Sequence, residues 1–327
     1  MMETLEDTEL CFPQLLNSSC WKKKRSESEA VLVYIVLSSI SLLTATLNLL
    51  VVISISHFKQ LHTPTNLLLL SLAVSDFFVG LLMSFQILLS DGCWFLSDHM
   101  CTLYGVLDYI ITSASVGTMV LISVDRYVAI CDPLHYPNKV TVRGASICTC
   151  LCWVCSVLYN SLVIKENFAQ PGRYNSCTGE CVVVINYIAG VVDVVLTFIG
   201  PVTVIIVLYM RVFAVAVSQA RAMRSHVAAL KRQRSETVFA KKSEMKAART
   251  LGVVVVVFLT CLCPYYCTSL AGPNTVTTVP LETWLFYFNS CLNPVIYAFC
   301  YPWFLKSVKI IVTFKILQPD SCETCIL

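Results

Sequence analysis

Charged residues are scarce in this sequence, and their scarcity excludes many classes of protein. Only 13 % of the 327 residues are Asp, Glu, Lys or Arg, whereas about a quarter is usual in soluble domains. Hydrophobic residues make up 57 %, and the mean hydropathy is +0.73. Neither a glycine-rich phosphate loop nor an HExxH zinc motif occurs. The composition is that of an integral membrane protein, and we expect no enzyme activity, no catalytic metal, no cofactor and no nucleic-acid partner.

The first 29 residues also lack the apolar stretch of a cleavable signal peptide. The first membrane segment must then serve as its own insertion signal, and we expect residues 1–29 to form an extracellular segment. Asn17, Ser18 and Ser19 form a glycosylation sequon, which has meaning only on the luminal side of the membrane. We therefore predict that Asn17 carries a glycan.

Long apolar runs dominate the rest of the chain. A helix needs about 20 apolar residues to cross the hydrocarbon core of a bilayer. Seven stretches qualify: 30–56, 66–90, 98–130, 145–164, 184–213, 247–271 and 281–301. The predicted fold is an all-α membrane protein, a seven-transmembrane helix bundle over residues 30–301.

Lysine and arginine predict the orientation of this bundle. With the N-terminus outside, the inner side and the inner helix ends hold 17 of the 23 Lys and Arg residues. The positive-inside rule favours that orientation, although the run 22–25 beside the first span opposes it locally. The basic stretch 218–249, between the fifth and sixth spans, is either a solvated loop or a contact surface for anionic lipid or a cytoplasmic partner.

Residues 302–327 predict a short amphipathic helix followed by a cytoplasmic tail. One apolar face is formed by Phe304, Val308, Ile311 and Val312. Such a face is typical of a helix that lies on the inner leaflet. Cys322 and Cys325 follow it as candidates for palmitoylation. The final residues TCIL are not a prenylation box, because that box needs its cysteine fourth from the end.

Eighteen cysteines are present, and most lie inside the predicted spans, where they behave as small apolar residues. Four others are predicted on the extracellular side, where disulfides persist: Cys20, Cys101, Cys177 and Cys181. A bridge from Cys101 to Cys181 would pin the outer loop over the bundle, and one from Cys20 to Cys177 would tie down the N-terminal segment. Cys11 and Cys93 remain as alternative partners, because sequence alone leaves the connectivity open.

Ionisable residues inside a span are functional candidates, because a charge in the membrane is costly. Asp108 lies two helical turns, about 10 Å, below Cys101 at the outer end of span three. Asp193 lies in the outer half of span five. Neither has a basic residue at its depth in any span, so each must be protonated, hydrated in a cavity, or paired with a cation from outside. Two such carboxylates at similar depth favour a cavity for a cation.

Two further charged positions lie deeper in the bundle. Asp76, midway along span two, is either a satisfied core polar group or the centre of a sodium site. Its candidate partners are Ser115, Asn289, Ser290 and Asn293. Asp125 and Arg126 lie at the inner end of span three. We expect them to form a local ion pair there, with either a structural role or a role in switching.

Many of these residues, in this order and spacing, closely resemble the motifs of the rhodopsin-like G-protein-coupled receptors. The motifs cover nearly the whole chain and comprise Asn48, LAVSD ending at Asp76, Cys101, DRY at 125–127, Trp153, Cys181, Pro201, Tyr209, Pro264 and NPVIY at 293–297. The stretch NSCLNPVIYAFCYPWF, 289–304, looks like the signature of one branch, the trace amine-associated receptors. The arrangement of Cys20 with the later pair Cys177 and Cys181 also looks like that branch, which has an additional disulfide bridge.

The resemblance implies an amine as ligand. Asp108 matches the position at which aminergic receptors hold the ammonium, and Asp193 resembles a second aspartate in a fish branch that senses diamines such as cadaverine or putrescine. A monoamine would leave one carboxylate unpaired, whereas a diamine would satisfy both. The other candidate ligand-binding residues are Tyr109, Thr112, Thr197, Tyr265, Tyr266, Trp284 and Tyr287. The aromatic ones either pack ordinarily or offer faces to an ammonium, and Tyr287 is expected to orient Asp108.

The same resemblance implies the plasma membrane of an olfactory sensory neuron and a stimulatory G protein that raises cyclic AMP. The residues implied in activation and coupling are Asp125, Arg126, Tyr127, Tyr209, Glu244, Phe258, Pro294 and Tyr297. Arg126 is expected to leave Asp125 and Glu244 when span six swings outward. Leu262 departs from the pattern, because most relatives have a tryptophan there and use its indole as a toggle beneath the ligand.

Other functions compete with a diamine receptor. A monoamine receptor for aromatic trace amines or serotonin-like ligands would share the whole architecture. A carboxylate-dependent amine transporter would usually show inverted repeats or broken spans in matching halves, and none is visible in the sequence. A channel would need a ring of pore-lining residues, whereas these acidic residues lie at isolated positions on different spans.

Overall fold

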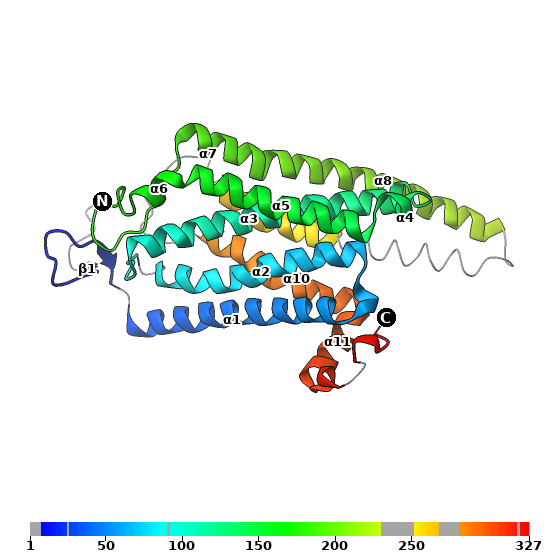
Figure 1. Ribbon diagram of the computed structural model, residues 1–327, viewed down its shortest axis with the longest axis horizontal. Coiled ribbons are helices and arrows are strands. Elements are labelled where there is room, and N and C mark those ends of the chain that lie inside the picture. The colour runs from blue at the N-terminus through cyan, green and yellow to red at the C-terminus, as the bar shows by residue number, and fades with distance from the viewer. Residues whose placement is uncertain are drawn as a thin grey trace.

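The chain folds into a bundle of long helices that run side by side (Figure 1). The computed structural model describes residues 8–24, 26–89, 92–229, 252–267, 281–318 and 321–326. The long helices are α1 (Glu27–His57), α2 (Pro64–Leu89), α3 (Asp98–Cys131), α5 (Val142–Val163), α8 (Gly200–Ala229), a helix over Gly252–Cys267, and α10 (Leu281–Cys300). The short helix α7 (Tyr187–Val194) precedes α8 in the fifth span. The shorter elements are β1 (Thr8–Leu10), β2 (Trp21–Lys23), η2 (Lys59–Leu61), α4 (Tyr136–Lys139), α6 (Lys165–Ala169), η3 (Val195–Ile199), α11 (Pro302–Val312), η4 (Lys315–Leu317) and η5 (Ser321–Glu323).

Within the described ranges, five helices are long and apolar enough to cross a membrane: α1, α2, α3, α5 and the run from Tyr187 to Val215. The helix Gly252–Cys267 is apolar but shorter, since the described residues end at both of its limits. α10 and α11 meet at an angle of 99°, so α11 lies across the end of the bundle. The helices occupy the predicted spans, and most of their ends agree to within a few residues.

The fifth span is the one whose limits differ most from the prediction. It begins at Tyr187, where the side chain of Asn186 caps the helix by accepting from the N–H of Ile188. It continues to Ala229 instead of ending at residue 213, because 214–229 contain good helix formers and neither Gly nor Pro. A π-helical turn, η3, joins α7 to α8, and the N–H of Gly200 there reaches back to the carbonyl of Val195. Pro201, which follows, has no N–H with which to continue the regular ladder.

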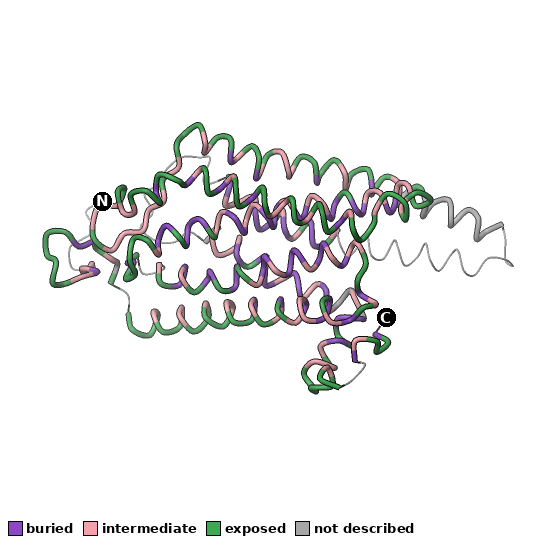
Figure 2. Tube along the Cα trace, in the orientation of Figure 1, coloured by how far each residue is buried: buried purple, intermediate pink, exposed green. Residues whose placement is uncertain are grey.

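Burial is concentrated on the inward faces of α2 and α3, while α1 and the outer sides of α5, α7 and α8 are largely exposed (Figure 2). The exposed positions on α1 include large apolar side chains such as Leu32 and Leu42, as suits helices surrounded by lipid. α1 and α2 approach closely at Gly80, where a Cβ atom would lie 2.7 Å from the backbone nitrogen of Ala45. Only glycine permits that approach.

Within the described residues, three disulfides hold the end of the bundle that carries the N-terminal segment. Cys101 pairs with Cys181 and Cys20 pairs with Cys177, as expected, and Cys11 pairs with Cys93. The third bridge settles a choice that the sequence left open, because the hairpin of β1 and β2 and the bridge between Ser19 and Thr178 bring the N-terminal segment against the outer loops. Asn17, the predicted glycan acceptor, is exposed on this segment.

The cytoplasmic end is closed by the chain after α10. Phe304 of α11 is buried, and Ser307 donates to Ser54 of α1 at 2.8 Å between the hydroxyl oxygens. Val312, on the predicted apolar face, is exposed. Ile326 is fully buried in the main core, and its N–H donates to Gln60 in the turn between α1 and α2. Cys322 is half-buried and Cys325 is exposed.

Candidate functional site

A cavity of about 440 Å³ lies in the extracellular half of the bundle, among α2, α3, α7, α10 and the helix Gly252–Cys267. Its volume is within the range of about 300–1,000 Å³ that small-molecule sites usually have. Six of the nine predicted ligand-binding residues line it: Asp108, Tyr109, Thr112, Tyr265, Tyr266 and Tyr287. The structure therefore assembles most of the predicted set in one place, although these residues come from three separate helices.

Asp108 is held in this cavity by a relay of hydrogen bonds. The hydroxyl of Tyr287 on α10 donates to Oδ1 of Asp108 at 3.0 Å. The Tyr287 hydroxyl lies 3.3 Å from that of Tyr104, which in turn donates to Oε1 of Gln86 on α2. All three partners are buried. The relay thus ties α2, α3 and α10 together at the carboxylate. The prediction that Tyr287 orients Asp108 agrees with this geometry, whereas Gln86 and Tyr104 were not foreseen, since nothing in their local sequence marks them.

Asp193 lies behind the cavity wall, and it is not among the residues that line the cavity. The cavity is lined by Gly190, which lies about one turn before Asp193, and by Val194, which directly follows it. Asp193 is buried, and its Oδ1 atom has no hydrogen-bond partner among the described residues. Thr197, one turn further on, bonds to the backbone carbonyl of Asp193, and its hydroxyl oxygen lies 3.2 Å from that of Tyr266 in the cavity wall. Asp193 is therefore next to the aromatic part of the cavity, although it does not line the cavity itself.

Two other predicted ligand-binding residues have different surroundings from those expected. Thr197 is buried and donates to the backbone carbonyl of Asp193 at 2.7 Å, and its hydroxyl oxygen lies 3.2 Å from that of Tyr266. It therefore links span five to the cavity wall. Trp284 packs on an apolar cluster that contains Trp94 and Met83. Trp284 does not line the cavity, although two members of that cluster, Tyr104 and Tyr287, do.

Neither carboxylate has a cationic partner among the residues that the structure describes. The ion pairs that the structure shows in the described part of the chain involve other acidic residues. A buried carboxylate without a counter-ion is unfavourable unless an external cation or a proton compensates it. Each of the two carboxylates therefore calls for either an external cation or a proton.

Comparison with known proteins identifies the family. Residues 47–297 match the 7 transmembrane receptor (rhodopsin family). The chain is 37 % identical to trace amine-associated receptor 13c of Danio rerio, over 97 % of this chain and 96 % of that protein. It is 38 % identical to trace amine-associated receptor 8a of Rattus norvegicus, over 96 % of this chain and 95 % of that one. The chain is a trace amine-associated receptor.

This membership decides the general function. A trace amine-associated receptor is a multi-pass G-protein-coupled receptor for amines, and it is not an enzyme. Membership of this family implies the plasma membrane as its location and a G protein as its partner. Trace amine-associated receptor 4 of Mus musculus is a further relative, 34 % identical over 96 % of this chain and 94 % of its own. The transporter and channel alternatives are excluded by this family assignment.

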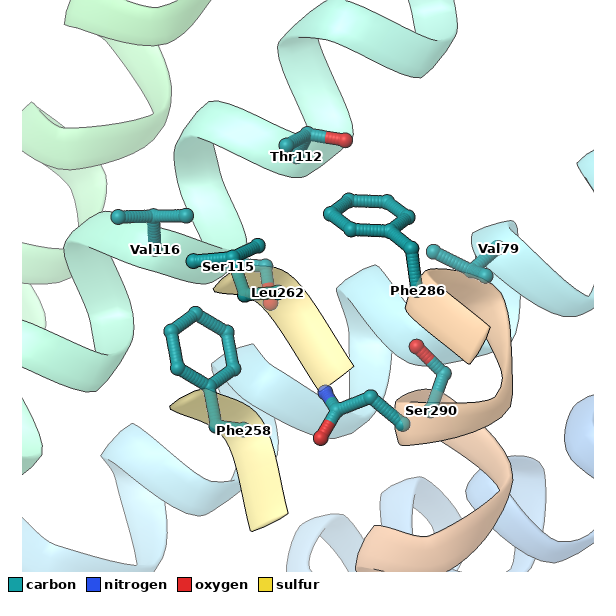
Figure 3. Close-up of a pocket in the computed structure, with 9 residues that line it drawn as sticks. Val79, Thr112, Ser115, Val116, Phe258, Leu262, Phe286 and Ser290 are labelled. Atoms are coloured by element: carbon teal, nitrogen blue, oxygen red, sulfur yellow. The ribbon is translucent and has the colours of Figure 1, made fainter. Parts of the chain in front are cut away.

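A second, much smaller cavity of about 20 Å³ adjoins the first (Figure 3). Phe258 and Leu262 reach toward it from the helix Gly252–Cys267, and Phe286 reaches toward it from α10. Thr112 and Phe286 line both cavities, so they form the floor of one and the roof of the other. Leu262 is buried here, and Phe286 packs against the same core.

Asp76 lies near this small cavity in a polar cluster. Its Oδ1 accepts from the hydroxyl of Ser290 at 2.7 Å, and its Oδ2 accepts from Nδ2 of Asn293 at 2.8 Å. Ser115 and Asn289, the other two predicted partners, line the small cavity instead. The Oδ1 atoms of Asn289 and Asn293 are buried without a hydrogen-bond partner in the described chain. The cluster therefore offers a carboxylate and uncommitted amide oxygens, which are suitable ligands for a hard cation.

At the cytoplasmic end, Asp125 and Arg126 form the expected ion pair. Nη2 of Arg126 lies 2.6 Å from Oδ2 of Asp125. Thr65 at the start of α2 donates to the same oxygen at 2.9 Å, and Tyr136 of α4 donates to Oδ1 at 2.8 Å. Sequence reasoning missed both of these partners. They lie 60 and 11 residues away from Asp125, and only the tertiary contact brings them together.

The remaining activation candidates surround this pair or the core above it. Tyr127 is half-buried and packs near Val212, while Tyr209 packs against the main core. Phe258 and Tyr297 belong to that core, and Pro294 is inside α10. Glu244 lies outside the described residues.

The turn that follows α3 contains a separate group of ion pairs, centred on Asp132. Lys139 and His135 both bond to Asp132. These two hydrogen bonds lower the pKa of Asp132 to about 2, and the bond from Lys139 has the larger effect. This carboxylate therefore stays ionised throughout the cellular pH range, and α4 stays linked to the end of α3.

Proposed function

We propose that this receptor responds to linear diamines with both nitrogens protonated, such as cadaverine or putrescine. The observation that carries the proposal is the buried Oδ1 of Asp193, which has no hydrogen-bond partner in the described chain. It lies behind the wall of a cavity that already contains a second carboxylate, Asp108. The two acidic groups call for two positive charges, and one ligand with an ammonium at each end supplies both.

The arrangement of the cavity suggests how such a ligand lies. One ammonium pairs with Asp108, whose other contacts are held by Tyr287. The alkyl chain crosses the aromatic wall formed by Tyr265 and Tyr266, and the second ammonium pairs with Asp193. Tyrosine faces stabilise a nearby ammonium by about 0.5–2 kcal/mol through the cation–π interaction.

Selectivity follows from the cost of an unpaired buried charge. A monoamine satisfies one carboxylate and leaves the other buried without a counter-ion, and breaking a buried pair in this way costs about 3–5 kcal/mol. About 1.4 kcal/mol corresponds to a tenfold change in affinity. We therefore expect the affinity for diamines to exceed that for monoamines by about two orders of magnitude or more.

Signalling is proposed to run through a stimulatory G protein that raises cyclic AMP, in olfactory sensory neurons. The bound diamine favours a state in which span six swings outward. Arg126 then leaves Asp125, breaking the contacts with Thr65 and Tyr136, and turns to the G protein or to Tyr209. A sodium ion at Asp76, with Ser115, Asn289, Ser290 and Asn293 around it, would stabilise the resting state.

The test is a cyclic AMP assay in cells that express the receptor, with linear diamines of increasing length beside monoamines of matched length. Asp193→Ala should reduce diamine potency by on the order of 100-fold or more at unchanged surface expression. Asp98→Asn is the control, because this exposed acidic residue lies on the outer end of α3 and does not line the cavity. An unchanged diamine response in Asp193→Ala, or equal potency of monoamines and diamines in the unsubstituted receptor, would contradict the two-carboxylate proposal.

A further inference from the structure

Gly190 occupies an unusual position among the glycines of the bundle. It lies in the middle of α7, lines the amine cavity, and donates its N–H to the carbonyl of Asn186 at 2.8 Å. A Cβ atom built on it would meet nothing within 4 Å. At Gly80 and Gly117, by contrast, a Cβ atom would lie less than 3 Å from a neighbouring residue. Packing between helices therefore explains those two glycines but not Gly190.

Local stability does not explain Gly190 either. Glycine inside a helix is unfavourable relative to alanine, because its backbone loses more freedom on folding. Alanine would fit the open space and would favour the helical backbone of α7. The reason for a glycine must therefore lie in what the open space itself is used for.

That space lies beside the second carboxylate. Asp193 follows Gly190 by three residues, so the two positions share one face of the helix about 5–6 Å apart. Side chains on a helix lean toward its N-terminus, and the Asp193 side chain therefore leans over the turn that contains Gly190. The other inward positions on this face, Val194 and Thr197, carry side chains of their own. Gly190 is the point at which this face of span five is bare.

We propose that Gly190 is a specificity-determining residue: its missing side chain leaves the passage through which one end of an unbranched diamine reaches Asp193. This inference rests on the proposed diamine function and deepens it. The passage admits a slender primary ammonium on a methylene chain and disfavours a branched or N-substituted end. A side chain at position 190 would stand between the cavity and the carboxylate.

The experiment uses the full-length receptor in the cyclic AMP assay, with putrescine and cadaverine as probes and surface labelling as a measure of folding. Gly190→Leu should lower diamine potency by on the order of 100-fold, as Asp193→Ala does, because either change removes the same ion pair. Gly190→Ala should lower it by only a few-fold and keep surface expression at or above the normal level. Val191→Phe adds as many carbon atoms on the exposed side of the same turn and should have no effect.

The decisive measurement is the double variant Gly190→Leu with Asp193→Ala. If both substitutions act on one contact, the double variant should be no weaker toward diamines than either single variant. Independent, multiplying losses would overturn the inference about Gly190, and so would a normal diamine response in Gly190→Leu. Failure of the proposed function looks different: the unsubstituted receptor would not respond to diamines, or Asp193→Ala would respond normally, and both proposals would then fall.

Discussion

Tyr287 and Asp108 lie 179 positions apart in the chain, and the hydroxyl of the first donates to the carboxylate of the second at 3.0 Å. This bond fixes one oxygen of the carboxylate to α10. Because Tyr287 is also 3.3 Å from Tyr104, movement of α10 relative to α3 is coupled to the group that is expected to hold the ligand. The relay gives the extracellular cavity a mechanical link to the span that carries the NPVIY motif.

Removal of this bond should weaken the response to amines without unfolding the receptor. A hydrogen bond to a charged group contributes about 1.5–3 kcal/mol, so Tyr287→Phe should lower potency by about 10- to 100-fold. Gln86→Leu acts at the far end of the relay and should lower it by a smaller factor. Tyr187→Phe, a change at an exposed tyrosine on α7, serves as the control. Equal potency in Tyr287→Phe and the unsubstituted receptor would show that Asp108 does not depend on the relay.

Tyr136→Phe should raise basal cyclic AMP. The substitution removes the bond of 2.8 Å to Oδ1 of Asp125 and leaves the ring in place. The acceptor is the ionised carboxylate of an ion pair, and a hydrogen bond to a charged group contributes about 1.5–3 kcal/mol, so the ratio of active to resting receptor should rise by roughly 10- to 100-fold. The measurement is ligand-independent cyclic AMP, normalised to receptor at the cell surface. A basal level that does not change, or that falls, would argue against a resting-state role for this contact.

Leu262→Trp should destabilise the receptor even though it introduces the tryptophan that the family resemblance led us to expect at this position. The cavity beside Leu262 is only about 20 Å³, and Phe286 reaches toward the same space. Overpacking of a filled core costs about 1–3 kcal/mol, so we expect lower thermal stability and lower surface expression. Leu262→Met conserves volume and should behave almost normally. Normal stability in Leu262→Trp would mean that Phe286 can give way to an indole.

Cys11→Ser, Cys93→Ser and the double variant should all lose the same amount of stability. One bridge joins these two residues across 82 positions, so removal of either end removes it completely. The expected loss is about 2–5 kcal/mol, measured as a drop in thermal stability of the purified receptor. Cys148→Ser, at an exposed free cysteine of α5, is the matched control. A double variant much less stable than either single variant would show that the two cysteines act independently.

Much of this molecule could be predicted from the sequence because the relevant signals are local. Hydropathy marks the spans, since each helix must present about 20 apolar residues to the lipid whatever its neighbours are. The scarcity of charge makes Asp76, Asp108 and Asp193 conspicuous for the same reason. Spacing along a helix was enough to place Asp108 below Cys101, because the rise per residue is constant.

Only the tertiary structure decided which of these residues meet. The partners of Asp108 and Asp125 come from other helices, and contact between helices depends on their rotation and packing, which no local pattern records. The bridge between Cys11 and Cys93 likewise required the N-terminal segment to fold against the outer loops. The facing of span five was decided in the same way: Gly190 and Val194 line the cavity, whereas Asp193, between them, does not.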